Sequence, residues 1–362
     1  MAKILIGVTF YSPHISGLTN YAKILAEELS KRGNKVKVIS GRYNINLKLK
    51  EKNNGVEIVR IPGQKIGKGF LMWNYPIMAK TMVRENEIIN PHLPSVESIW
   101  LAIWAKVYHK RLVVTHHCEF WGGNFGNRII GYFTYPLHWL VYKMADKIVV
   151  ASQDYAKHSK FLKQFNKKLI YTFPPIKLVK NDEGNTIRKR QKIVGFVGRI
   201  SWEKGLPYLI KAMEKINAKL ELVGPYNQLD KDNTYEFIKN KLGKNVCFLG
   251  KISDKELVSF YKKIDCLVLP SINNLEAFGM VQAEAIISGT PVVASNLPGV
   301  RVPVKISGMG EISKIADSKD LARKIKLVLK RGKKYYRQKA INLNLFDYKK
   351  TVNDYERAFS IK

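Results

Sequence analysis

Residues Pro270 to Ser295 read PSINNLEAFGMVQAEAIISGTPVVAS, and this stretch decides the fold that we expect. The apolar run that ends at Pro270 predicts a strand, and a polar loop then leads into a helix that begins near Met280. Gly289 ends this helix, and the run from Val292 to Ala294 predicts the next strand. Strand, helix and strand in this order form one βαβ unit of an α/β fold.

Two carboxylates, Glu276 and Glu284, lie in this unit with seven residues between them. Ligands of open α/β sheets bind at the carboxyl ends of the strands, so both acids are expected near the binding edge. They could form a general acid/base pair, as in a hydrolase. They could equally accept hydrogen bonds from the vicinal hydroxyls of a ribose or sugar, or be solvated surface acids.

The length of 362 residues predicts two domains, each large enough to bury its own core. The cysteines Cys118, Cys247 and Cys266 are far apart and form no CxxC pair, so neither disulfides nor a zinc site is expected. Cys247 and Cys266 lie in apolar, strand-like runs and are expected in the core.

The charge balance is strongly basic, with 62 Lys and Arg against 29 Asp and Glu, a net charge of +33. Such an excess indicates an anionic partner, which could be nucleic acid, acidic lipid or a phosphorylated substrate. The basic residues are scattered along the chain, however, so a lysine-rich composition of the host explains them equally well. A nucleic-acid footprint clusters on one face, which the sequence does not reveal.

The chain begins MAKILIGVTF, which is too short and lacks the cleavage site of a signal peptide. No stretch has the roughly 20 apolar residues that a membrane-spanning helix needs. The longest apolar segment, 129–142, is broken by Pro136. We therefore expect a cytoplasmic protein.

Strands and helices alternate in both halves of the chain. The first half opens with a strand over 3–10, a loop that contains Gly17, a helix over 18–31 and a strand over 36–39. Backbone N–H groups at such a helix start can bind an anion, although an ordinary turn has the same composition. The alternation predicts two doubly wound, Rossmann-like α/β sheets.

The domain boundaries are expected where the character of the chain changes. The segment 173–191 contains two prolines and many charges without a clear period, so it predicts a linker. Residues 1–172 then form the N-terminal domain and 192–340 the C-terminal domain. The last segment, 341–362, is expected to be a helix that packs back on the N-terminal domain.

Further polar residues follow predicted strands. Arg199 and Lys204 flank a loop that leads into a helix, an arrangement that suits a diphosphate, although two solvated cations are the commoner case. His116 and His117 end a buried strand near Glu119. Adjacent residues on a strand point in opposite directions, so only one histidine can face a binding site, and a metal pair is not expected.

Taken together, these elements resemble the family 4 glycosyltransferases, retaining enzymes with the GT-B fold of two Rossmann-like domains that face a cleft. The signature PSxxExFGxxxxEAxxxGxPVVAS stands almost complete at 270–295. A second element, GRxxxxKG, is present at 198–205, and the Pro/Gly loop after the first strand is a third. The resemblance covers nearly the whole chain in the right order.

The resemblance implies a role for each matching residue. Glu284 would hold the donor ribose, and Glu276 would hold the donor sugar. Arg199 and Lys204 would neutralise the departing diphosphate, so that neither a metal nor a cofactor is required. His117 would contact the donor sugar near its reacting carbon, with His116 as the alternative.

With His117, Glu276, Arg199 and Lys204 as the catalytic set, Ile252 would meet the base and Gly17 would approach the phosphates. The implied donor site comprises Gly17, Arg199, Lys204, Gly224, Ile252, Glu276, Phe278, Gly279, Met280 and Glu284. Two departures from the family pattern concern this site. The first loop carries Ser16-Gly17 where the family usually has two glycines, and Arg301 stands where a Glu is common.

The resemblance thus implies a retaining, metal-independent hexosyltransferase that uses a UDP-, GDP- or ADP-sugar and a glycan or lipid-linked acceptor. Aromatic and basic residues of the N-terminal half suit work as a peripheral protein at an anionic membrane surface. The alternative is a basic nucleic-acid-binding protein on a degenerate transferase fold, but such a protein is expected to lose the donor residues that this chain keeps. A phosphorylase or an epimerase fits less well, because phosphorylases are much longer.

Overall fold

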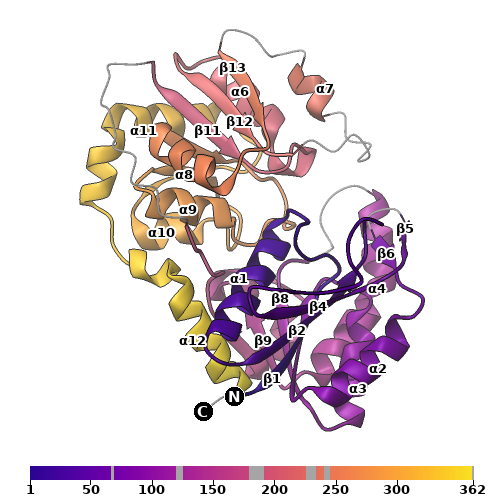
Figure 1. Cartoon of the computed structure of the whole chain (residues 1–362). Helices are drawn as coiled ribbons and strands as arrows, with labels where there is room; N and C mark the ends of the chain where they lie inside the picture. The colour runs from indigo at the N-terminus through magenta and orange to yellow at the C-terminus, as the bar shows by residue number, and fades with distance from the viewer. Residues whose placement is uncertain (67–68, 120–124, 179–190, 226–233, 240–244, 361–362) are drawn as a thin grey trace. The chain divides into compact units, whose positions relative to one another are not determined.

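The computed structural model describes residues 1–362 except 67–68, 120–124, 179–190, 226–233, 240–244 and 361–362. The chain divides into two compact units (Figure 1). The N-terminal unit combines Met1–Pro175 with Asp347–Lys362, and the C-terminal unit is Ile176–Phe346. Most of the expected linker lies outside the described residues.

The N-terminal unit contains an eight-stranded sheet in the order β10-β9-β8-β7-β1-β2-β4-β3. All neighbours in it are parallel except β3, which pairs antiparallel with β4. The strands are β1 (Lys3–Gly7), β2 (Lys35–Gly41), β3 (Lys50–Asn53), β4 (Val56–Ile61), β7 (Ile88–Leu93), β8 (Arg111–His116), β9 (Lys147–Val150) and β10 (Leu169–Tyr171). A separate antiparallel pair is formed by β5 (Gln64–Ile66) and β6 (Gly69–Leu71).

Two groups of helices cover this sheet (Figure 1). The first group packs together as α2 (Tyr75–Glu85), α3 (Ser98–Val107) and α4 (Phe125–Met144). The second consists of α1 (Gly17–Lys31) and α12 (Tyr348–Phe359), which contact each other, and α12 also contacts β8. Near β9 lie α5 (Gln153–His158) and the 3₁₀ helix η1 (Leu162–Lys168).

The C-terminal unit contains a parallel six-stranded sheet in the order β13-β12-β11-β14-β15-β16. Its strands are β11 (Ile193–Val197), β12 (Lys219–Val223), β13 (Val246–Gly250), β14 (Cys266–Leu269), β15 (Val292–Ser295) and β16 (Gly310–Ser313). Its helices are α6 (Leu206–Met213), α7 (Thr234–Lys239), α8 (Asp254–Lys263), α9 (Met280–Ile287), α10 (Val302–Ser307) and α11 (Ser318–Gln338), with the 3₁₀ turns η2 (Trp202–Lys204) and η3 (Leu343–Phe346). The two parallel α/β sheets confirm the predicted fold class.

The stretch 270–295 folds as its composition predicts. Strand β14 is fully buried, α9 begins at Met280, and β15 follows Gly289, which has a φ of +77°. Glycine adopts this left-handed conformation without steric cost, so it ends the helix and turns the chain into the next strand.

The sequence did not predict β7, a fully buried strand in the centre of the N-terminal sheet. Its residues, IINPHL, include Asn90 and Pro91, which both argue against a central strand. Cys247 was expected in the core but is only half-buried, because β13 is an edge strand of its sheet. Within the described residues, no helix is both long and apolar enough to span a bilayer.

Glycines bring the carboxyl ends of β11 and β12 into close contact. Gly224, directly after β12, has a φ of +148°, and a Cβ at this position would lie 1.8 Å from the carbonyl oxygen of Gly198. No side chain fits there without movement of the backbone. The close contact therefore depends on a glycine at position 224.

We expect Gly224→Ala to lower the free energy of unfolding of the C-terminal unit by roughly 2–4 kcal/mol, because it adds both backbone strain and a clash. Gly17→Ala is the matched control, since a Cβ there meets nothing within 4 Å. That control should change stability by less than about 0.5 kcal/mol. Thermal unfolding followed by circular dichroism measures both, and equal stability of the two variants would contradict the expectation.

Candidate functional site

The topology of the C-terminal sheet brings two predicted loops together. From β11 the chain proceeds outward through β12 to β13, and it then returns to place β14 on the other side of β11. Ligands of doubly wound sheets bind at such a reversal of strand order. The loop after β11 carries Arg199 and Lys204, and the loop after β14 carries Glu276. These residues therefore follow neighbouring strands.

A direct backbone contact joins the two loops. The N–H of Ile272 donates a hydrogen bond of 3.0 Å to the carbonyl of Glu203. Gly205 has a φ of +70°, and a Cβ there would lie 2.0 Å from the carbonyl oxygen of Pro270. The glycine of the GRxxxxKG element thus allows the loops to approach closely.

Each of the two cations has a carboxylate partner. The ammonium of Lys204 binds the carboxylate of Glu276, and their side chains are only 21% and 15% exposed. Arg199 is more exposed and forms an ion pair with Glu203. Burial opposes ionisation of Glu203, but the positive charges of Arg199 and Lys204 and hydrogen bonds to the carboxylate together outweigh this effect, so the pKa of Glu203 is lowered. The pairs hold two positive groups beside one another in the loop after β11.

Glu284 has a different environment, inside α9. Its side chain is 9% exposed and accepts a hydrogen bond of 2.7 Å from the hydroxyl of Tyr261 on α8. Burial raises the pKa of Glu284, and the Tyr261 hydrogen bond partly opposes this rise. Glu276 and Glu284 therefore have separate partners, Lys204 and Tyr261.

The start of α9 presents backbone groups beside Glu276. Gly279, the N-cap residue, has a φ of +78° and offers no side-chain cap. The N–H of Gln282 donates to the Gly279 carbonyl, and the N–H groups of Met280 and Val281 at the helix start are suited to bind an anion. Phe278 is buried, and its carbonyl accepts a hydrogen bond from the Gln282 amide. The same amide donates to the carbonyl of Val300 at 2.8 Å. Gln282 thus ties the loop before Met280 to the turn after β15.

The other residues expected at the donor site lie at the same edge of the sheet. The N–H of Gly224 donates to the carbonyl of Gly250 at 2.9 Å, which joins the ends of β12 and β13. Ile252 is half-buried in the loop after β13. Arg301 is the N-cap residue of α10, and its guanidinium donates a hydrogen bond of 3.2 Å to the side-chain oxygen of Asn296. The Arg301 guanidinium therefore contacts the turn after β15, to which the Gln282 amide also donates a hydrogen bond.

Gly17 and His117 belong to the N-terminal unit. Gly17 begins α1, where the Ser16 hydroxyl caps the helix by accepting from the N–H of Thr19 at 3.1 Å. The position is exposed and its backbone does not require a glycine. Whether Gly17 approaches a phosphate stays a prediction.

The adjacent histidines at the end of β8 have separate partners, as their strand position predicts. His117 is partly exposed, and its Nε2 lies 2.9 Å from Nδ1 of His92 on β7. Its ring also meets the ring of Tyr21 edge-on at 4.8 Å. Burial lowers the pKa of His117 to about 3, so the imidazole is neutral at neutral pH.

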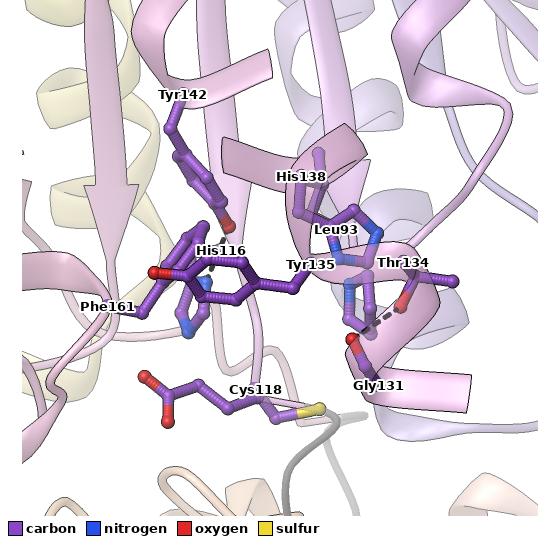
Figure 2. Close-up of a pocket in the computed structure, with 11 residues that line it drawn as sticks. Leu93, His116, Cys118, Gly131, Thr134, Tyr135, His138, Tyr142 and Phe161 are labelled. Carbon is purple, nitrogen blue, oxygen red and sulfur yellow. Dashed lines mark hydrogen bonds between the residues drawn. The ribbon is translucent and has the colours of Figure 1, made fainter. Parts of the chain in front are cut away.

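His116 lines a pocket of the N-terminal unit (Figure 2). Its Nδ1 is 2.6 Å from the hydroxyl of Tyr142, and burial lowers its pKa to about 3. The pocket is small, with room for roughly one water-sized group, and it is partly open to solvent. Residues lining it are Leu93, Pro94, His116, Cys118, Glu119, Gly131, Thr134, Tyr135, His138, Tyr142 and Phe161. Among the described lining residues, Glu119 is acidic and its pKa is raised by burial, and none is Lys or Arg. Such a lining suits a hydroxyl group better than an anion.

The sequence did not identify Tyr261 in the C-terminal unit as a hydrogen-bond partner, nor His92 and Tyr355 in the N-terminal unit. Tyr355 on α12 shares a hydrogen bond of 2.8 Å with Tyr21 and one of 2.7 Å with Thr115. The only sequence signal of such a role is a polar residue at an apolar position, and that signal does not identify the partner. No cluster of metal ligands occurs among the described residues.

Family models match nearly the whole chain in two consecutive pieces. The model described as "Glycosyltransferase Family 4" matches residues 15–175, and the one described as "Glycosyl transferases group 1" matches residues 180–342. The chain belongs to the family 4 glycosyltransferases. The expected family is thereby confirmed.

Curated relatives match mainly one part of this family 4 chain. An uncharacterized glycosyltransferase of Methanocaldococcus jannaschii is 37% identical over 141 residues, which cover 36% of this chain and 35% of that protein. The chain spans about a third of the length of the first curated relatives that it matches.

Solved structures share the fold over the full length. The sucrose-phosphate synthase of Thermosynechococcus elongatus superposes with a TM-score of 0.77 at 19% identity, and the match covers 100% of both chains. Anabaena HepE in complex with UDP-glucose gives a TM-score of 0.73 at 18% identity, again over 100% of both chains. Because these identities are below 25%, the comparisons establish the fold alone, and that fold is GT-B.

Tyr261→Phe tests the buried partner of Glu284. The tyrosine hydroxyl stabilises the charged carboxylate, so its loss should cost about 1.5–3 kcal/mol of unfolding free energy at pH 8. The cost should decrease as pH falls through the raised pKa of Glu284, because a neutral carboxyl group depends less on this donor. Urea unfolding between pH 5 and pH 8 measures the difference.

The control for this experiment is the same substitution in a Glu284→Gln background. Glutamine does not ionise, so the effect of Tyr261→Phe should then be independent of pH. A pH-dependent effect that persists in this background would assign the titration to another group.

Proposed function

We propose that this protein is a retaining glycosyltransferase that moves a hexose from a nucleoside-diphosphate sugar to a hydroxyl group of an acceptor. The observation that carries the proposal is the pairing of Lys204 with Glu276 beside Arg199, on neighbouring loops at the reversal of strand order. Related folds support the choice of donor, since HepE was solved with UDP-glucose.

In this proposal the ion pairs preorganise the diphosphate site. Glu276 and Glu203 hold Lys204 and Arg199 in place without a ligand. A bound diphosphate would compete for both cations, and the uncapped start of α9 would add backbone N–H donors. Negative charge develops on the diphosphate as the glycosidic bond breaks, and fixed positive groups stabilise it. No metal ion is needed for this step.

The two carboxylates take different roles in the proposal. Glu276, once released by Lys204, can accept hydrogen bonds from sugar hydroxyls next to the diphosphate. Glu284 is held by Tyr261 and accepts the two ribose hydroxyls. Ile252 and Gly224 lie at the ends of β13 and β12, where the base and ribose would follow.

The acceptor side belongs to the N-terminal unit in this proposal. The described lining of the His116 pocket includes the Glu119 carboxyl group and no Lys or Arg, so this pocket favours a glycan hydroxyl over a phosphate. Apolar side chains are also exposed near the starts of α2 and α3, with Trp73 at 68%, Ile77 at 70% and Trp100 at 38%. Lys80 lies 5.2 Å above the ring of Trp104 in the same region. Aromatic and basic groups together suit the surface of an anionic membrane that carries a lipid-linked acceptor.

A donor screen tests the proposed reaction. We expect one of the UDP-, GDP- or ADP-sugars to raise the Tm and to be hydrolysed slowly. Lys204→Ala should lower kcat/KM by about 10²–10³-fold, because it removes a cation from the leaving group. Lys326→Ala on the exposed face of α11 is the matched control and should leave kcat/KM unchanged. Failure of every nucleotide sugar to bind would refute the transferase.

Sedimentation with vesicles tests the membrane surface separately. The protein should bind vesicles that contain anionic phospholipid at low salt and be released at high salt. The double variant Trp73→Ser, Ile77→Ser should bind several-fold more weakly, whereas Ile45→Ser, at another exposed apolar position, should bind normally. Equal binding by all three proteins would exclude this surface while leaving the donor site untouched.

A further inference from the structure

A continuous chain of buried polar groups lies behind His117 in the N-terminal unit. Asn90 and His92 come from β7, Thr115 from β8 and Tyr355 from α12. All four side chains are at most 1% exposed. Buried polar groups of this kind persist only if their hydrogen bonds are satisfied, so the direction of each bond is constrained.

The amide of Asn90 determines the first direction. One side of the amide lies 2.6 Å from the backbone carbonyl of Val113. A carbonyl can only accept, so the Asn90 nitrogen must lie on that side. The Asn90 oxygen then lies 3.0 Å from Nε2 of His92 and must accept from it. The reverse orientation would place two oxygens in contact.

The protonation of His92 in turn determines which ring nitrogen of His117 carries a proton. Since Nε2 of His92 carries its proton and burial lowers the pKa of His92 far below the ordinary value, Nδ1 of His92 is unprotonated. This nitrogen lies 2.9 Å from Nε2 of His117. One of the two nitrogens must donate, so the proton is on Nε2 of His117. Two lone pairs would otherwise face each other.

We propose that Asn90 and His92 are positioning residues that hold His117 in its Nε2–H tautomer and leave its Nδ1 as a hydrogen-bond acceptor for a substrate hydroxyl group. Within the described part of the chain, no hydrogen bond to Nδ1 of His117 is found, and the ring is partly exposed. An acceptor nitrogen binds a hydroxyl group of a sugar or of an acceptor. It repels an unprotonated phosphate oxygen.

The orientation of the His117 ring is fixed by a backbone hydrogen bond of His117 and by the ring of Tyr21. The N–H of His117 donates 2.9 Å to the carbonyl of Leu93, and the Tyr21 ring packs edge-on against the imidazole. Tyr21 is itself held by Tyr355, whose hydroxyl also bonds Thr115, the second partner of the Asn90 amide. The C-terminal helix therefore supports the orientation of His117.

The tautomer can be measured without any substrate. In protein labelled with ¹⁵N in its seven histidines, long-range ¹H–¹⁵N spectra distinguish a protonated from an unprotonated ring nitrogen. His117→Asn identifies the signals of His117 by their loss. We expect Nε2 to be protonated and Nδ1 unprotonated. A protonated Nδ1 in the wild-type protein would overturn the proposal.

Variants of His92 then test the cause. His92→Phe removes the acceptor, so the His117 signals should become those of exchanging tautomers. His92→Gln keeps an amide oxygen that can accept and should restore the Nε2–H pattern. Tyr142→Phe, which removes the partner of His116 on the same strand, should leave the His117 signals unchanged. An unchanged His117 spectrum in His92→Phe would refute the role of His92.

The effect of the His117 tautomer on catalysis rests on the proposed transferase function. There, His92→Phe should lower kcat/KM about 10–100-fold, and His92→Gln should recover most of this loss. If no nucleotide sugar is a substrate but the tautomer is as described, the proposed function fails and the positioning role stands. If His92→Phe fails to fold, the wild-type and His92→Gln spectra still decide the tautomer.

Discussion

The contact between Gly205 and the carbonyl of Pro270 is the constraint on which the C-terminal site depends. It exists because β11 and β14 are neighbours although more than sixty residues separate them in sequence. Parallel strands place their carboxyl ends at one edge, and a glycine lets the two following loops touch. These two loops carry Lys204 and Glu276, which form an ion pair.

The cations of this site lose hydration when they are partly buried, and the same cations are suited to bind a diphosphate. A cation held in a partly buried loop loses hydration, and a neighbouring carboxylate offsets that loss. Lys204 and Arg199 each have such a partner, so both cations are compensated by a carboxylate before any ligand arrives. A diphosphate can replace the carboxylates as the partner of the cations, because it offers more charge and more acceptor oxygens. Glu276 then becomes available for a neutral ligand.

In the N-terminal unit, polar groups are buried inside the sheet and need hydrogen-bond partners there. Strand β7 carries Asn90 and His92 into the centre of a sheet, where unpaired groups would each cost about 1–3 kcal/mol. Neighbouring strands and α12 supply their partners. The strand is therefore stable in spite of its composition, and the resulting chain of hydrogen bonds reaches the surface at His117. A helix 334 residues away in sequence from Tyr21 completes it.

The sequence by itself determined the α/β class, the βαβ unit at 270–295 and the positions of Arg199, Lys204, Glu276 and Glu284 after strands or on a helix. These features depend on local signals: apolar periodicity, glycines at turns and the spacing of charges. Only the tertiary structure decided the partners, namely Glu276 for Lys204, Tyr261 for Glu284 and His92 for His117. Such pairs join residues that are distant in sequence, so they follow from strand order and helix packing. A buried polar residue is stable only where that packing supplies its partner.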